Sequence, residues 1–397
     1  MVRLNAEILF VLPNAVESVE SGRTSLTRVP ARPVEFRRVE STIISPYQFT
    51  ELRQECPSNP APEPSGTVLL SRKELRIVGT GASGGYEGDL ICRIEEYARR
   101  CADIVADESF DVIHAHDWVT FPAGILIAAR TGKPLVVHVH STEFDRSGEC
   151  VNQPVYDIER RGMHAASAVI AVSHLTKRII VDRYDVPADK VAVVHNGMEA
   201  AKAEPSPAAR PGRTGGMKTV LFLGRLTMQK GPEFFVRAAE RVLSRRNDVR
   251  FLMAGWGDLG PRIVEQVAGR GLGRRIRFAG FLRGTEVERA YRLADVYVMP
   301  SISEPFGLTA LEAVRYGVPV ILSKNSGVAE VLPVGSLKVD FWDVDRIADR
   351  IIALLDYPAL GDALCRRATA EMQPLTWDEA ARKCAGVYRE QIDALRG

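Results

Sequence analysis

Short apolar segments alternate with longer amphipathic segments along most of this chain, and the alternation falls into two blocks. In the first block, strand-like segments occur at 7–12, 111–114, 135–139, 168–172 and 191–194, with helical periodicity at 90–106 and 175–183. In the second, strand-like segments occur at 219–223, 249–254, 276–279 and 295–299, with helical periodicity at 234–245, 261–268 and 286–293. This order predicts an α/β protein in which parallel sheets are wrapped by helices.

A stretch rich in proline, alanine and glycine separates the two blocks. Residues 200–216 contain Glu204-Pro205-Ser206-Pro207 and have no apolar period to bury, which is typical of a linker. A chain of 397 residues is long enough for two cores. We therefore expect a first domain at 1–199, a second at 217–375 and a final amphipathic helix at 376–397 that crosses back to the first domain.

The charge balance excludes some partners. With 52 basic and 50 acidic residues the net charge is +2, so the chain has no broad basic field for nucleic acid, and any anion site must be local. The apolar runs are too short for an integral membrane segment, and the start lacks the apolar stretch of a signal peptide. We expect a cytoplasmic protein with reduced cysteines, and the composition indicates nothing about its oligomeric state.

Two carboxylates lie eight positions apart in the segment from Ser303 to Glu312. The apolar strand before them ends at Pro300, which places Glu304 at the carboxyl end of a strand. Helical periodicity resumes at Thr309, so we expect Glu312 in the first turn and free backbone amides at 306–309 that suit phosphate. This pattern predicts a sugar-nucleotide site. The alternative is a helix cap and a solvated glutamate.

A second candidate loop runs from Gly224 to Pro232, between a strand and a helix. It carries Arg225 and Lys230 beside Gly224 and Gly231. A guanidinium binds phosphate through paired hydrogen bonds and an ammonium adds a compact charge, so the pair suits a diphosphate. The alternative is two solvated basic residues on a surface loop.

Together these motifs resemble the retaining GT-B glycosyltransferases, a broad group that includes the glycogen and starch synthases. The resemblance rests on the Gly224-Arg225 to Lys230-Gly231 loop, the Glu304 to Glu312 spacing and Gly327-Val328-Ala329-Glu330-Val331. In the first half, 110–118, 136–145 and 195–198 are similar to segments of the same family. The resemblance implies two Rossmann-like, doubly wound parallel-sheet domains facing a cleft.

The resemblance also implies an activity, the transfer of a hexose from a nucleoside diphosphate to an acceptor hydroxyl with retained configuration. UDP-glucose or ADP-glucose would be the donor, and an α-1,4-glucan, another glycan or another hydroxyl compound the acceptor, with no obligatory cofactor. Arg225 and Lys230 would neutralise the departing diphosphate, Glu304 would bind sugar hydroxyls, and Glu312 would accept from the ribose. The remaining donor-binding positions implied are Gly224, Phe306, Gly307, Leu308 and Thr309.

On the first-domain side, the resemblance places His140 near the reacting carbon and His116 and Asp117 beside the transferred sugar. His138 precedes His140 by two residues, and we expect the two side chains to point to opposite faces of their strand, with only His140 functional. His114 and His116 share a strand face, so a zinc site is the alternative for this segment. Because no third ligand occurs at a recognisable spacing, we expect no metal site.

Two further motifs are expected to have no part in the chemistry. Gly79-Thr80-Gly81-Ala82-Ser83-Gly84 has dinucleotide-loop spacing but no helix directly behind it, so we expect a loop. Asp343-Val344-Asp345 is an Asp-x-Asp triplet just before a helix, and we interpret it as a cap.

The start of the chain departs from the family pattern. The family's first strand, Gly-rich loop and helix, roughly thirty residues, would precede the strand at 7–12, and no such loop occurs near Met1. This leaves two alternatives to an active transferase: a catalytically impaired sugar-nucleotide or glycan-binding remnant, and a GT-B relative with another reaction, such as an epimerase.

Overall fold

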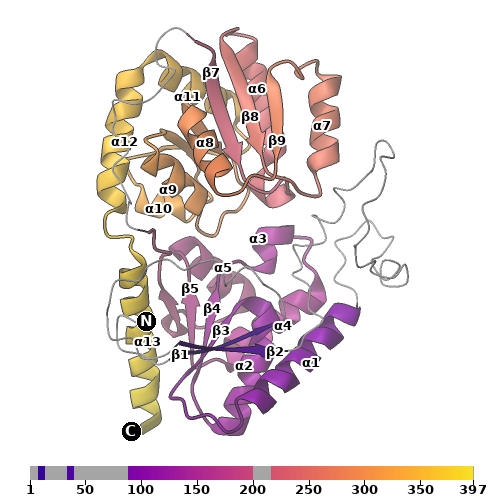
Figure 1. Cartoon of the computed structure of the whole chain (residues 1–397), viewed down its shortest axis with the longest axis vertical. Helices are drawn as coiled ribbons and strands as arrows, with labels where there is room; N and C mark the ends of the chain where they lie inside the picture. The colour runs from indigo at the N-terminus through magenta and orange to yellow at the C-terminus, as the bar shows by residue number, and fades with distance from the viewer. Residues whose placement is uncertain (1–7, 14–33, 40–87, 200–215, 397) are drawn as a thin grey trace, which may run out of the picture.

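The structure is a computed structural model of the chain that describes residues 8–13, 34–39, 88–199 and 216–396. Strands β1 (Ile8–Pro13) and β2 (Val34–Val39) form a parallel pair. The rest is two α/β domains, shown one above the other in Figure 1. Residues 1–7, the Gly79 to Gly84 loop and all but the last residue of the linker predicted at 200–216 lie outside the described residues.

The first domain is built on a four-stranded parallel sheet in the order β3-β4-β5-β6. Its elements are α1 (Gly88–Ile104), β3 (Ile113–His116), α2 (Asp117–Thr131), β4 (Leu135–Val139), α3 (Glu143–Ser147), α4 (Gln153–Ala165), β5 (Ala168–Ala171), α5 (His174–Tyr184), a 3-10 turn (Ala188–Lys190) and β6 (Val191–Val193).

The second domain is built on a six-stranded parallel sheet. Its elements are β7 (Lys218–Leu223), the 3-10 turn η6 (Met228–Lys230), α6 (Pro232–Leu243), β8 (Val249–Ala254), α7 (Gly260–Gly269), β9 (Ile276–Gly280), α8 (Thr285–Leu293), β10 (Val296–Met299), α9 (Leu308–Arg315), β11 (Val320–Ser323), α10 (Val328–Val331), β12 (Leu337–Val339), α11 (Val344–Asp356) and α12 (Pro358–Met372). The chain ends in α13 (Trp377–Arg396), drawn in yellow beside the first domain in Figure 1.

The strand order of the second sheet fixes where a ligand can bind. The order is β12-β11-β10-β7-β8-β9, so the chain winds outward from β7 in one direction, then returns to β10 and winds outward in the other. This is the doubly wound order, and its reversal lies between β7 and β10. In sheets of this order, ligands bind at the carboxyl ends of the two strands on either side of the reversal.

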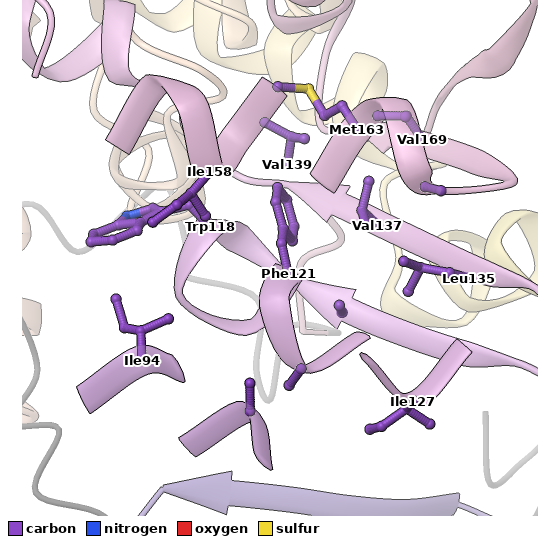
Figure 2. Close-up of a cluster of buried hydrophobic side chains, with 14 of the residues drawn as sticks. Ile94, Trp118, Phe121, Ile127, Leu135, Val137, Val139, Ile158, Met163 and Val169 are labelled. Carbon is purple, nitrogen blue, oxygen red and sulfur yellow. The ribbon is translucent and has the colours of Figure 1, made fainter. Parts of the chain in front are cut away.

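The two faces of the first sheet have different partners. Leu135, Val137 and Val139 of β4 point into a buried cluster with residues of α1, α2 and α4, shown in Figure 2. Alternate residues point the other way, where Val136 packs with Cys384 and Val387 of α13. The side chains of β4 are buried on both faces, as expected for a strand inside a parallel sheet. Within the described residues, no helix is both long and apolar enough to cross a membrane.

Candidate active site

A partly buried ion pair lies at the reversal point of the second sheet. Lys230 ends the short turn that follows β7, and Glu304 lies in the loop after β10. The Nζ atom of Lys230 is 2.5 Å from Oε2 of Glu304. Glu304 is only 6% exposed, so its charge has lost most of its hydration and requires a partner. The structure thus joins the two motifs that the sequence analysis identified separately.

Glycine at two positions allows these loops to approach each other. Gly231 adopts φ +64°, and a Cβ atom there would lie 2.2 Å from the carbonyl oxygen of Pro300 at the end of β10. Gly307 adopts φ +108°, and its Cβ would press on Val328 and on Cγ of Glu304. Any side chain at either position would be strained and would displace the backbone or Glu304.

Helix α9 begins beside Glu304 without a side-chain cap. Gly307 is its N-cap residue, so Leu308 and Thr309 lie in its first turn. Backbone amides at a helix start favour an anion. Phe306, directly before this turn, is buried. The expectation that Glu312 lies in the first turn was wrong, because the helix starts at Leu308 and Glu312 is its fifth residue.

Two tyrosines that the sequence analysis did not single out orient polar groups of α9. The hydroxyl of Tyr291 donates to Oε2 of Glu312 at 2.8 Å, and the hydroxyl of Tyr297 lies 2.8 Å from Oγ1 of Thr309. Both tyrosines are buried, on α8 and β10. The apolar periodicity of those segments explains why the sequence shows the two residues only as core positions.

Gly224 and Arg225, the remaining candidates in the loop after β7, lie at the start of that loop. Gly224 donates its amide to the carbonyl of Ala254, and its own carbonyl faces Gly255, where a Cβ would come within 1.9 Å. Arg225 follows with an exposed side chain. The close approach of two backbones explains the glycine at position 255.

On the first-domain side, Asp117 holds the loop after β4. Its Oδ1 accepts from the backbone amide of His140 at 2.7 Å. Asp117 has φ +57°, a left-handed conformation that is uncommon for residues other than glycine and marks a constrained position. Burial raises the pKa of Asp117, while His140 and Arg146 oppose that rise.

Four histidines form one cluster on the face of the first sheet that α13 covers. His114 and His116 come from β3, and His138 and His140 from β4 and the residue after it; His116 pairs with His138 in the strand register. The rings of His138 and His140 stack with centroids 4.3 Å apart. The expectation that these two point to opposite faces was therefore wrong, because residues two apart on a strand share a face.

The cluster is electrostatically unusual. Desolvation, reinforced by repulsion from His140, lowers the pKa of His116 to about 4, although part of its side chain is exposed. Desolvation also holds the pKa values of His114 and His138 well below the usual range. Nδ1 of His116 lies 2.9 Å from Nε2 of His140, at hydrogen-bond distance. These three rings are neutral at neutral pH, whereas histidine near its ordinary pKa would be partly charged.

Contacts between the two domains surround the site. Ser303 Oγ, next to Glu304, donates to Oδ1 of the buried Asp145 at 2.5 Å. At a second contact, the carboxylate of Glu330 in α10 accepts from the backbone amides of His174 and Leu175, the first two residues of α5. No local sequence pattern indicates either contact, because the partners are 155 or more positions apart.

The Asp-x-Asp triplet behaves as a cap. Oδ1 of Asp343 accepts from the amide of Arg346 at 2.9 Å, and α11 starts at Val344. The expectation of an N-cap is confirmed.

Two sequence families match the chain in adjoining segments. The model described as "Glycosyl transferases group 1" matches residues 217–357, and the one described as "Glycosyltransferase Family 4" matches 60–202. The first match covers the sheet that carries Lys230 and Glu304, and the second covers the histidine cluster.

Two relatives and a solved structure agree with this family. The chain is 33% identical to a D-inositol 3-phosphate glycosyltransferase of Acidothermus cellulolyticus, over 72% of this chain and 68% of that protein. It is 32% identical to a glycogen synthase of Mycobacterium tuberculosis, over 72% of this chain and 70% of that protein. A crystal structure of Anabaena HepE in complex with UDP and glucose superposes with a TM-score of 0.63 at 20% identity, covering 77% of this chain and 83% of that one.

The doubly wound sheet with an ion pair at its reversal point, the facing parallel-sheet domain and these matches all point the same way. The arrangement of the two sheets is the GT-B fold that the sequence motifs predicted. The chain belongs to the glycosyltransferases of group 1 and family 4.

Proposed function

We propose that this glycosyltransferase moves glucose from UDP-glucose or ADP-glucose to an acceptor hydroxyl with retention of the anomeric configuration. The observation that carries the proposal is the Lys230–Glu304 pair at the reversal point of the second sheet. A cation and a buried carboxylate at that place suit a ligand that is a diphosphate at one end and a polyol at the other.

The donor would exchange partners with this pair. The diphosphate oxygens draw Lys230 away, and Arg225 on the same loop adds a second positive charge to the departing group. Glu304 then accepts hydrogen bonds from sugar hydroxyls in place of the lysine. Charge that grows on the leaving diphosphate is stabilised in a site out of bulk water, where such stabilisation is worth several kcal/mol.

Helix α9 would bind the rest of the donor. Its uncapped start at Gly307, Leu308 and Thr309 offers backbone groups to phosphate and sugar, and Phe306 and Gly224 would line the same site. Glu312 would accept from the ribose hydroxyls while Tyr291 holds its carboxylate. No protein nucleophile is required if the donor phosphate takes the acceptor proton.

The first domain would supply the facing wall. His140, held by Asp117, would contact the sugar near its reacting carbon, and His116 and Asp117 would lie on the acceptor side. An acceptor hydroxyl on a glucan or on another polyol fits the relatives: one is a glycogen synthase, another a D-inositol 3-phosphate glycosyltransferase. The HepE complex holds UDP and glucose, which supports a glucose donor.

The test is a donor and acceptor panel. The purified chain is incubated with UDP-glucose, ADP-glucose, UDP-galactose or GDP-mannose and with a maltooligosaccharide or inositol 3-phosphate, and nucleoside diphosphate release is measured. We expect acceptor-dependent release from a glucose donor, lost in Lys230→Ala. A chain that binds the donor but releases nothing with any acceptor is a binding remnant, and sugar isomerisation without an acceptor indicates an epimerase. Either result contradicts the proposal.

A further inference from the structure

The histidine cluster contains unpaired nitrogen atoms that the proposed sugar transfer does not use. In the part of the chain that the structure describes, five buried side-chain atoms have no hydrogen-bond partner, and three belong to this cluster: Nε2 of His114 and both ring nitrogens of His138. His138 is only 7% exposed. A buried polar atom without a partner destabilises the folded state by about 1–3 kcal/mol, and here three such atoms lie on two neighbouring histidines. Such a penalty points to a ligand.

Ring nitrogens of three of the histidines converge. One ring nitrogen from each of His114, His116 and His138 lies within 4.8 Å of the other two. A tetrahedral zinc ion with bonds of about 2.0–2.1 Å holds its nitrogens roughly 3.4 Å apart. The widest pair therefore has to close by at most roughly 1.4 Å. The rings of His114 and His116, which stack on that of His138 with interplanar angles of 10° and 28°, have to turn toward the ion for this.

The sheet itself produces this convergence. His114 and His116 are two residues apart on β3 and so share a face. His138 lies on β4, and the register places His116 opposite His138. Neighbouring strands are about 4.8 Å apart, so the rings project side by side. The centroids of His114 and His116 are each 5.2–5.3 Å from that of His138. The register thus brings a third histidine, His138 on the neighbouring strand, to the two that share a face of β3.

We propose that His114, His116 and His138 bind a divalent transition metal ion of the Zn²⁺ class. Three imidazoles without a carboxylate or thiolate are a donor set that suits zinc and disfavours magnesium and calcium. The exposed edge of His116 provides the entry path, and a water molecule completes the coordination.

The hydrogen bonds of two of the three ligands, His114 and His116, fit this assignment. Nδ1 of His114 is bonded to the hydroxyl of Tyr388 on α13 at 2.5 Å, which leaves Nε2 for the metal. Nδ1 of His116 is bonded to His140, which again leaves Nε2. Ligating histidines usually have their second nitrogen oriented in this way. Metal binding then ties α13 to the sheet and makes His116 the donor to Nε2 of His140, which fixes the tautomer of His140.

The experiment measures metal binding directly, on protein prepared without a polyhistidine tag. Metal content after dialysis against Zn²⁺ is determined together with the visible absorption on titration with Co²⁺. We expect one equivalent of zinc and the absorption of tetrahedral cobalt in the native chain, and neither in His138→Val. Valine suits a buried strand position and removes both unpaired nitrogens, so this variant is expected to fold. His164→Gln, which changes an exposed histidine of α4, should bind like the native chain.

Thermal unfolding tests whether bound zinc stabilises the fold through His138. Zinc should raise the Tm of the native chain and of His164→Gln but leave that of His138→Val unchanged, because an ion that binds only the folded state stabilises it. The proposal is overturned if native protein and His138→Val bind the same amount of metal, or if zinc shifts both Tm values equally. No readout depends on sugar transfer, so the result is independent of the proposed function.

Discussion

At the scale of single residues, the site depends on how a buried charge is compensated. Glu304 has lost most of its hydration, and Lys230 is the cation at 2.5 Å that balances it. A buried pair of this kind is a weak source of stability, because desolvation offsets much of the attraction. Its position at the strand ends is better explained by ligand binding than by stability.

The first prediction concerns this pair. Glu304→Gln and Lys230→Ala are each expected to lower kcat at least about 100-fold, equivalent to about 2.7 kcal/mol of transition-state stabilisation. The measurement is nucleoside diphosphate release at saturating donor. The control is Lys324→Ala, which removes an exposed lysine paired with Asp340. Unchanged turnover in both site variants would falsify the site assignment.

The second prediction separates the carboxylate of Asp117 from its backbone conformation. Asparagine tolerates positive φ and keeps an oxygen for the amide of His140, so Asp117→Asn should retain most of the activity. Asp117→Gly relieves the strain at φ +57° but removes the acceptor of the hydrogen bond from His140. We expect kcat to fall roughly tenfold, which corresponds to the loss of about 1.4 kcal/mol from one hydrogen bond. If the glycine variant is as active as the native chain, the carboxylate does not position His140.

At the scale of secondary-structure elements, the predictions succeeded where the pattern is local. The strands expected at 135–139 and 249–254 coincide with β4 and β8. Helix α2 was missed, because it is packed between α1 and α4, has little polar face and contains Pro122. The sequence places Lys230 and Glu304 in separate loops; their contact follows from the pairing of β7 with β10, which no local pattern encodes.

The same limit explains the histidines. Alternation along one strand places His114 and His116 on one face, but the register between β3 and β4 brings His138 to them. Likewise, Tyr291 and Tyr297 look like core residues in sequence, and only the tertiary structure shows which polar groups of α9 their hydroxyls meet.

The third prediction concerns the start of α5. Although burial alone would raise the pKa of Glu330, hydrogen bonds from His195 and from the amides of His174 and Leu175 lower it overall. A carboxylate whose pKa is lowered by folding stabilises the folded state at any pH above its ordinary pKa. This contribution to the free energy of unfolding is lost as the pH falls through the lowered, folded-state pKa. We expect Glu330→Gln to lower the free energy of unfolding by about 1 kcal/mol at pH 7, as for the loss of other negative charges at a helix start.

The measurement compares the Tm of the native chain and Glu330→Gln from pH 7 downward. The difference should persist above the ordinary glutamate pKa of 4.5 and shrink at more acidic pH. Glu265→Gln, at an exposed position of α7, is the control. A difference that does not change with pH would show that the charge of Glu330 is irrelevant to the contact.

At the scale of the whole molecule, the account requires that the two domains meet closely around the site. Gly327, on the second domain, shows how close they are, because a Cβ there would lie 2.6 Å from Cβ of Ser173 on the first domain and 2.2 Å from the carbonyl of Pro305. Ser303 and Asp145 make a hydrogen bond across the same interface. Closure of this kind excludes water from the reacting groups.

The fourth prediction tests this closure. Gly327→Ala should lower the free energy of unfolding by about 1–3 kcal/mol through overpacking. It should also raise the KM for the donor, because the interface has to open to admit the methyl group. Gly386→Ala on α13 is the matched control: a Cβ there meets nothing within 4 Å, and alanine favours a helix by up to about 1 kcal/mol. The measurements are small-angle scattering and donor kinetics. Equal KM values for the two variants would contradict a tightly closed interface.

The measurement that tests the central claim most directly is the anomeric configuration of the first product. The chain is mixed with the glucose donor that it accepts, as the α-linked nucleotide, and with the acceptor, and the coupling of the new anomeric proton is followed by NMR from the earliest turnovers. The account predicts an α-glycosidic product and one nucleoside diphosphate for each glucose transferred. A β-linked product, or diphosphate released without a new glycosidic bond, would contradict it.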